Sequence, residues 1–288
     1  MNIFKKAIVL LGFFAIVVGC YLLGVEFFSE NRSFVNRWKK LEPGFSLAEF
    51  TAPVISPVGD SRITVLKIDP NRYQLKLLCA TEYDGISRPI ETWAKKFHLL
   101  AAVNAGMYQK DNLTGVGFLK NFEHFNNPYL NSNNAILAFN PVDSTVPPVQ
   151  IIDRTCQDFT RLRDKYHSFL QSIRMISCQQ ENVWEPQSQR WSIAALGIDR
   201  SGNVLFIFTR SPYTVHTFIN MLLTLPIKIY NAMYLEGGPV ASLFVSAGGL
   251  TISRTGTFQN GLLDNQPLGT PSSIPNVLGI VRKAATEK

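Results

Sequence analysis

The stretch IYNAMYLEGGPVASLFV, residues 229–245, joins two apolar, β-forming runs through one acid, two glycines and a proline. Such runs bounded by Gly and Pro predict two strands with a tight reversal between them. Glu236 follows the first run directly, so we expect it half-buried at a strand end, where burial raises a carboxyl pKa and suits acid or base chemistry. Gly237 and Gly238 can present backbone N–H groups to an anion. A plain hairpin turn with an exposed Glu is the alternative.

The residues before this stretch predict a hairpin and then a helix. Residues 191–211, WSIAALGIDRSGNVLFIFTRS, read as two strands around a Ser-Gly-Asn turn. Residues 214–225, TVHTFINMLLTL, have the spacing of an amphipathic helix, with Thr214 as N-cap and Pro226 after its end. His216 lies in the first turn of this helix. A lone His is more often structural than catalytic, so the helix alone does not mark a site.

Further upstream, strand patterns again dominate. Residues 62–69 and 73–82 flank a Pro-Asn-Arg turn and predict a hairpin, and residues 88–100 predict a helix. LAAVNAG, residues 100–106, predicts a buried strand that ends at Asn104 and Gly106, where small residues let a ligand or another backbone approach. A tight turn with Asn in the left-handed region is the common alternative.

The middle of the chain has one long irregular stretch. Residues 107–135 are rich in Asn, Gly and aromatics and predict a functional loop. Residues 135–141 and 146–153 predict strands, and residues 157–173 predict a helix. Hairpins with segregated helices favour an α+β fold with mixed or antiparallel sheets over a doubly wound sheet.

The N-terminus predicts a membrane segment. Lys5 and Lys6 precede an uncharged apolar run over residues 7–25, about the ~20 residues that span a bilayer. We expect a signal anchor over residues 1–28, a juxtamembrane linker over 29–60 and one domain over 61–283. A short N-terminus before a single apolar segment usually acts as an export signal, so the main domain is expected outside the cytoplasm. A cleaved signal peptide or a lipoprotein box at VVGC, residues 17–20, remains an alternative.

Charge and cysteine content exclude some functions. The net charge of +7 is spread over 288 residues without a basic run interleaved with aromatics, so nucleic-acid binding is not expected. Cys156 and Cys178 are the nearest pair for a disulfide, and buried thiols are equally compatible with the sequence. No Cys/His cluster has zinc spacing, so no metal site is predicted from the sequence; a single divalent ion near Glu236 stays an open alternative, and the sequence does not identify a cofactor. GxSxG, GxxxxGK[ST] and GxGxxG are absent.

Three segments in order resemble the phosphodiester glycosidase family. AVNAGMYQKDNLTGVGFLKN, residues 102–121, is similar to the family's Asn-Ala-Gly-Met-Phe signature and the strand after it. SNNAILAFN, residues 132–140, resembles its next strand. Residues 191–245 resemble its C-terminal half, in which a hairpin, a helix with a His and Leu-Asp-Gly-Gly follow one another. The resemblance covers roughly residues 60–282. The family, which includes the lysosomal enzyme that uncovers mannose 6-phosphate, hydrolyses sugar phosphodiesters.

The resemblance implies a set of site residues by position. The catalytic candidates are Glu236, His216 and Asn104, and the substrate-binding candidates are Gly106, Gly237, Gly238 and Ser242. The chain departs from the family twice. Glu236 stands where the family usually has Asp, and a shift of about 1 Å in a catalytic group can cost ~10²-fold in rate. SIAALGID, residues 192–199, has Ile or Ala where the family usually carries an Arg, the natural clamp for a phosphodiester.

Three functions follow as hypotheses. The first is a membrane-anchored, extracytoplasmic hydrolase whose substrate is a sugar phosphodiester or a related glycan. The second is a catalytically impaired relative that binds an envelope glycan or a partner protein, which the two departures favour. An anchored protein with a purely structural role is the third, and it predicts no cleft around Asn104 and Glu236. An Arg or Lys within ~4 Å of Glu236 separates the first from the second.

Overall fold

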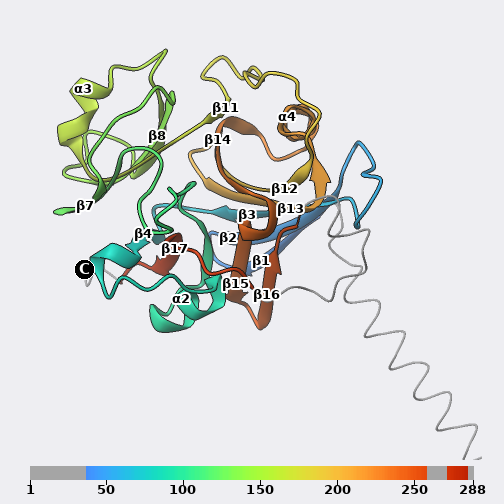
Figure 1. The fold of residues 1–288 in the computed structure, drawn as a ribbon, viewed down its shortest axis with the longest axis horizontal. Helices are drawn as coiled ribbons and strands as arrows, with labels where there is room; N and C mark the ends of the chain where they lie inside the picture. The colour runs from blue at the N-terminus through green and yellow to red at the C-terminus, as the bar shows by residue number, and fades with distance from the viewer. Residues whose placement is uncertain (1–36, 258–270, 285–288) are drawn as a thin grey trace, which may run out of the picture.

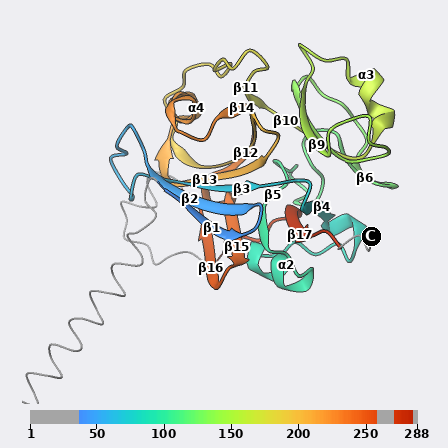
Figure 2. The ribbon, with the colours of Figure 1, turned by 180° about the vertical axis from the view of Figure 1, so that it is seen from behind.

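The computed structural model describes residues 37–257 and 271–284, and their strands form three sheets (Figures 1 and 2). We call them the large, terminal and middle sheets. The large sheet runs in the order β1 (Trp38–Glu42), β2 (Phe45–Thr51), β3 (Arg62–Ile68), β13 (Val204–Tyr213), β12 (Trp191–Asp199), β14 (Ile229–Gly237), β11 (Arg174–Ile176). The terminal sheet runs β16 (Leu250–Thr255), β15 (Ser242–Ala247), β5 (Ala101–Asn104), β17 (Asn276–Arg282), β4 (Tyr73–Cys79). The middle sheet runs β7 (His124–Asn127), β6 (Leu119–Asn121), β10 (Tyr166–Ser172), β8 (Ala135–Pro141), β9 (Val149–Asp153).

Every strand pair in the described ranges is antiparallel. The prediction of mixed or antiparallel sheets is therefore confirmed, and the sheets are antiparallel. Helices are few and short: α2 (Ile90–Lys96), α3 (Phe159–Leu162) and α4 (Val215–Thr224), with 3₁₀ turns η1 (Ala80–Glu82), η2 (Arg163–Lys165) and η3 (Gly238–Val240). The three α-helices lie apart from one another at the edges of the molecule (Figure 1).

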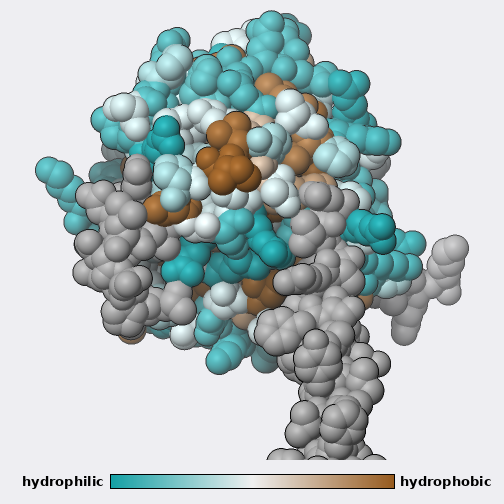
Figure 3. Space-filling model, turned by 90° about the vertical axis from the view of Figure 1, so that its right-hand side faces the viewer, coloured by the Kyte–Doolittle hydropathy of each residue, from teal (hydrophilic) through white to brown (hydrophobic). Residues whose placement is uncertain are grey.

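The main core lies where the sheets meet. It contains side chains from all three, such as Phe206 of the large sheet, Val103 of the terminal sheet and Leu137 of the middle sheet, all fully buried. A second cluster packs α4 against the other face of the large sheet, through Phe218 and Leu222 among others. The surface drawn in Figure 3 is mostly hydrophilic, with apolar side chains in small groups.

Several sequence predictions are confirmed at the level of elements. The β12–β13 hairpin forms with direct cross-strand pairing from Ile193 to Ile198. Helix α4 begins after Thr214, whose side chain accepts a hydrogen bond from the Thr217 N–H, the usual role of an N-cap. Its buried residues recur at the three- and four-residue spacing of one helix face, and α2 likewise forms inside residues 88–100.

The hairpin predicted over residues 62–82 does not form, and neither does the plain hairpin turn that was the alternative at residues 236–239. Strands β3 and β4 follow one another in sequence, but β3 pairs with β2 and β13 while β4 pairs with β17. Strands β14 and β15 are likewise consecutive and belong to the large and terminal sheets. The turn after β3 and the turn after β14 therefore each carry the chain from one sheet to another. The strands on either side of these turns are buried where the sheets pack together.

Three further predictions differ from the structure. The helix predicted over residues 157–173 is limited to α3 and η2, and Tyr166–Ser172 is the central strand of the middle sheet, since pairing with β6 and β8 outweighs local helix preference. The predicted linker over 29–60 contains β1 and β2, whose Phe45, Leu47 and Phe50 are buried in the core. Likewise, within the predicted loop 107–135, strands β6 and β7 form.

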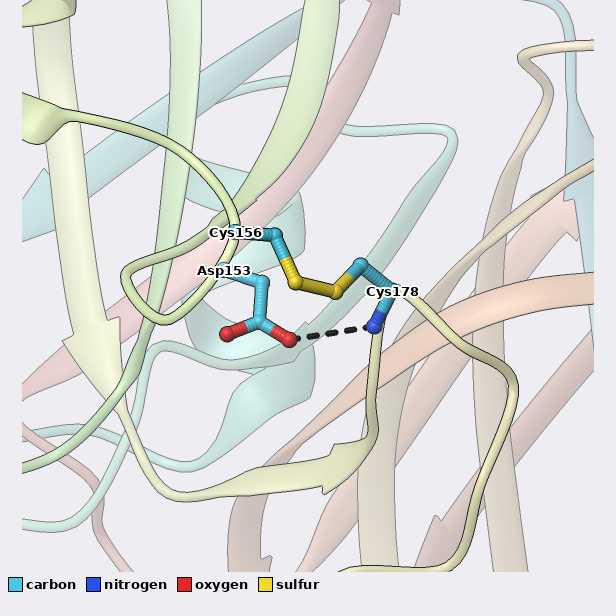
Figure 4. Close-up of side chains that lie close together, drawn as sticks. All are labelled: Asp153, Cys156 and Cys178. Atoms are coloured by element: carbon cyan, nitrogen blue, oxygen red, sulfur yellow. Dashed lines mark hydrogen bonds between the residues drawn. A yellow bond between two sulfur atoms is a disulfide. The ribbon is translucent and has the colours of Figure 1, made fainter.

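The predicted signal anchor, residues 1–28, lies outside the described residues. Among the helices of the described ranges, none is long and apolar enough to cross a membrane. Cys156 and Cys178 form a disulfide between the turn after β9 and the turn after β11, which ties the middle sheet to the large sheet (Figure 4).

Candidate active site where the chain crosses between two sheets

Glu236 lies at the crossing from the large sheet to the terminal sheet. It is the second-last residue of β14, and η3 then carries the chain into β15. Opposite β12, the register shifts so that Ala194 pairs with Glu236 and Ala195 with Tyr234, which leaves Leu235 as an extra residue. Such bulges turn a side chain out of the regular alternation and are frequent next to active sites. The strand end therefore breaks the regular pairing at Glu236.

Asn104 holds this crossing in place from the terminal sheet. Its Nδ2 donates to the Val240 carbonyl over 2.8 Å, and its Oδ1 accepts from the Ser242 N–H over 2.7 Å. The side chain is 1% exposed. Asn104 ends β5, the neighbour of β15, so one amide locks the backbone on both sides of Ala241. The structure thus brings Asn104 to the Glu236 segment, as a clamp on its backbone.

Ser242 is buried beneath the same clamp. Its hydroxyl donates to the Val240 carbonyl over 3.0 Å, and the residue is fully shielded from solvent. In this conformation Ser242 supports the turn, and its hydroxyl does not face solvent.

The glycines of the site are required by close approach or by backbone conformation. A Cβ on Gly237 would lie 2.0 Å from the Tyr234 hydroxyl and 2.4 Å from Trp191 Nε1. Gly238 and Gly106 have φ of +66° and +80°, the left-handed region that side chains disfavour. Gly106 follows Asn104 at the end of β5, so both predicted glycine segments meet here. These positions keep the backbone tight around Glu236.

The Glu236 carboxyl is electrostatically unusual. Burial raises its pKa to about 7, opposed in part by a hydrogen bond from the Gly237 N–H to Oε1 over 2.9 Å. The residue keeps partial solvent exposure, although the carboxyl itself lies among protein atoms. A carboxyl with a pKa near neutrality can both give and take a proton at physiological pH. The Gly237 N–H is engaged by this carboxylate and is not directed at an external anion.

Aromatic residues surround the carboxyl, and sequence reasoning did not single them out. Burial raises the pKa of Tyr108 and of Tyr234, and the negative charge of Glu236 raises each further, which places both hydroxyls in its field. The Tyr234 hydroxyl accepts a hydrogen bond from Trp191 Nε1 over 3.0 Å. The Trp184 ring packs on Tyr234 with centroids 5.4 Å apart. The segments that resemble the family contain Tyr108, Trp191 and Tyr234. Their nearness in sequence to the candidate Gly and Glu residues was the signal that could have identified them.

His216 is joined to this aromatic group only indirectly. Its Nδ1 lies 2.6 Å from the Trp184 carbonyl, and its own carbonyl accepts from Asn182 Nδ2. Among the described residues the hydrogen bonds of His216 go to the 182–184 loop, and Trp184 in turn contacts Tyr234. His216 therefore positions the loop that covers the aromatic group.

Glu236 has no ion-pair partner within 4 Å in the described part of the chain. The residue that faces it across the strand pair is Ala194, which lies in the 192–199 stretch where the family resemblance calls for an Arg in place of an Ile or Ala. In the described ranges, Asp153, Cys156 and Cys178 are the one group of potential metal ligands close together. Its two sulfur atoms are joined in the disulfide, so the group offers a single carboxylate.

Comparison with solved structures supports the fold. The catalytic domain of zebrafish N-acetylglucosamine-1-phosphodiester alpha-N-acetylglucosaminidase, auto-inhibited by its pro-peptide, matches with a TM-score of 0.61 at 12% identity, over 86% of each chain. A hypothetical protein from Synechocystis matches with a TM-score of 0.56 at 15% identity, over 86% of this chain and 64% of that one. No curated protein matches the sequence.

The family itself is shown by sequence. The model of the phosphodiester glycosidase family matches residues 97–281, well over half of the chain. The matched range begins before β5 and ends in β17, so it includes Asn104, the aromatic group and Glu236. The chain belongs to the phosphodiester glycosidase family.

Proposed function

We propose that the chain is a hydrolase that cleaves the bond between a sugar and a phosphate in a sugar phosphodiester, with Glu236 as its acid–base group. The observation that carries this proposal is a carboxyl of pKa about 7 at the crossing between two sheets. The family assignment supports the reaction class, and the zebrafish structure carries the name of an enzyme that acts on an N-acetylglucosamine phosphodiester.

In the proposed reaction, water adds to the sugar carbon and the phosphate oxygen leaves. A proton must reach the leaving oxygen, and a proton must be removed from the water. Glu236 exchanges one of these protons, since about half of its carboxyl groups carry a proton at a pH equal to the pKa. Both tyrosine hydroxyls lie in its field, and Tyr108, which is partly exposed, binds a sugar or phosphate oxygen.

The remaining candidate residues act by holding the backbone of the site in position. Asn104 fixes the backbone that follows Glu236, through Val240 and Ser242. Gly106, Gly237 and Gly238 let backbone pass close to the substrate, and His216 holds the Trp184 loop. Positioning of this kind matters because displacement of a reacting group by about 1 Å can cost ~10²-fold in rate.

The test is a hydrolysis assay with the purified full-length chain. A panel of sugar phosphodiesters that includes an N-acetylglucosamine phosphodiester is incubated with and without divalent cations. The proposal predicts release of the free sugar and a phosphomonoester. Failure to turn over every member of the panel, by a chain whose folding is verified by circular dichroism, would reject it.

A second candidate function is binding without catalysis, to an envelope glycan or a partner protein. The observation that favours it is the lack of a cationic partner within 4 Å of Glu236 in the described residues, with Ala194 at the facing position. A phosphate there would have no guanidinium clamp from β12. The same panel separates the two, since a pure binder retains sugar phosphodiesters without releasing product.

We also propose that the main domain is anchored to a membrane and lies outside the cytoplasm. The apolar run over residues 7–25 supports an anchor or export signal. The Cys156–Cys178 disulfide supports an oxidising compartment, because such bonds are rare in the cytosol.

A further inference from the structure

A cavity of ≈ 720 Å³ lies between the middle sheet and the large sheet, and Glu236 is not part of its lining. Its walls come from β9, from the turns that carry Cys156 and Cys178, from the end of β12 and from the start of β14. Asn231, in its lining, stands five residues before Glu236 on the same strand, roughly 17 Å at the usual rise per residue. The cavity is therefore separate from the candidate active site and shares its strands.

The walls of this cavity are cross-linked. The Cys156–Cys178 disulfide lies on its rim, and the Cys178 N–H donates to Asp153 Oδ2 over 3.0 Å (Figure 4). Arg174 Nη1 lies 2.6 Å from the other Asp153 oxygen in a largely buried ion pair. Asn231 Nδ2 donates across the sheets to the Ile151 carbonyl over 3.1 Å. These bonds hold the two sheets at a fixed separation, so the cavity is formed before a ligand arrives.

The charged groups of the lining are already engaged. Asp199 Oδ1 accepts from the N–H groups of Ser201 and Asn203 over 2.8 and 2.9 Å, and its Oδ2 accepts from Asn203 Nδ2. The Arg200 guanidinium donates to Gln180 Oε1. The two charges are of opposite sign and are the charged side chains of the lining, so the lining has no net charge and suits a neutral ligand.

Neutral amides make up the polar part of the lining. Gln157 Nε2 donates to Gln150 Oε1 over 3.2 Å, and Gln150 Nε2 donates to the Tyr166 hydroxyl over 2.7 Å, which fixes both amides. Asn231 Oδ1 is buried without a hydrogen-bond partner. Each carboxamide both donates and accepts, as a sugar hydroxyl does. Hydroxyls that enter the cavity can therefore bond to the remaining donor and acceptor positions of Gln150 and Gln157, which are partly exposed.

An exposed aromatic ring completes the cavity. Tyr230 is 39% exposed and lines the cavity beside Asn231. A tyrosine ring offers an apolar face for C–H groups and a hydroxyl at its edge, so it can pack on the flat face of a sugar ring. We propose that this cavity binds a neutral oligosaccharide, independently of the site around Glu236.

The test measures binding of neutral tetrasaccharides to the full-length chain by calorimetry, with cellotetraose, chitotetraose, maltotetraose and mannotetraose as probes. At least one probe is expected to bind with a Kd of about 1 mM or tighter. Tyr230→Ala should weaken that binding about tenfold, as expected for loss of a ring contact. Gln157→Ala, which removes one of the amides of the lining, should weaken it too. Tyr129→Ala, at a ring 76% exposed and outside the cavity, is the matched control and should bind as the wild type does.

Glu236→Gln separates the two sites. Because the proposed cavity lies elsewhere, this variant should bind the tetrasaccharide with unchanged affinity. No binding of any probe would overturn the proposal. So would binding that survives both Tyr230→Ala and Gln157→Ala, or binding that Glu236→Gln abolishes.

Discussion

At the residue scale, the pKa of Glu236 has a measurable consequence for stability. Burial raises it from 4.5 to about 7, so between these pH values the folded chain holds a proton that the unfolded chain releases. Folded-state stability therefore falls as pH rises through this window, by about 3 kcal/mol in total. Glu236→Gln removes the ionisation and should raise the melting temperature at pH 8 while leaving it nearly unchanged at pH 4.

The control for this comparison is Glu185→Gln, at an exposed carboxyl on the loop before β12. It should change the melting temperature little at either pH. Equal effects of Glu236→Gln at pH 4 and pH 8 would mean that the carboxyl is not buried as described.

Gly237 tests the packing around the carboxyl. Gly237→Ala places a methyl group 2.0 Å from the Tyr234 hydroxyl, so the ring must move, at a cost of about 1–3 kcal/mol. Urea denaturation should show this loss, and removal of the hydroxyl in Gly237→Ala/Tyr234→Phe should recover part of it. Gly85→Asn is the control, since Gly85 has a left-handed φ of +70° and nothing within 4 Å. An unchanged stability of Gly237→Ala would contradict the close approach.

At the scale of elements, Asn104 joins β5 to the segment between β14 and β15. Asn104→Ala leaves the buried Ser242 N–H without its partner and the Val240 carbonyl with the Ser242 hydroxyl alone, so we expect a loss of about 1–3 kcal/mol together with lost activity. Asn104→Asp keeps the acceptor but replaces the donor by an oxygen that faces the Val240 carbonyl and buries a charge, so it should lose at least as much stability at neutral pH. Asn71→Ala, at an exposed turn, is the control in the same denaturation experiment.

A residue that acted on substrate alone would behave differently. Asn104→Ala would then lose activity and keep wild-type stability, and the clamp described above would be wrong.

Elements with local signals could be predicted from the sequence. Helix α4 has a capping Thr214 and a regular apolar face, and the β12–β13 hairpin has its own turn. The path of the chain between sheets could not be predicted. Gly237-Gly238-Pro239 indicates a turn, but it does not determine whether the next strand pairs in the same sheet or in another one. Tyr166–Ser172 is buried on both faces as a central strand, so it lacks the alternation that would have separated it from a helix.

From the sequence, the residues of the candidate site could be predicted only by the order in which they match the family's motifs along the chain. Glu236, Asn104 and the glycines meet as the family resemblance implies, and the structure gives Asn104 a contact to the backbone. The Tyr108, Trp191 and Tyr234 group depends on contacts between β12, β14 and the loop after β5, which no local pattern encodes. The burial of the carboxyl follows from that group.

At the scale of the whole molecule, the Cys156–Cys178 disulfide links the middle sheet to the large sheet and bears on where the chain works. Its cysteines are 22 residues apart, so replacing both with Ser should cost about 3 kcal/mol. In cells, thiol alkylation before and after reduction should label these two cysteines only after reduction, with buried Cys79 as the internal control for denatured samples. Labelling of both without reduction would contradict an extracytoplasmic domain.

The central claim is that Glu236 exchanges a proton during hydrolysis of a sugar phosphodiester. The most direct measurement compares initial rates of an N-acetylglucosamine phosphodiester for wild type and Glu236→Gln across pH 5–9. The wild type should show a limb near pH 7 and the variant a loss of about 10²-fold or more without that limb, since general acid–base groups contribute on that scale. A folded Glu236→Gln chain with the wild-type rate and the same pH profile would contradict the account.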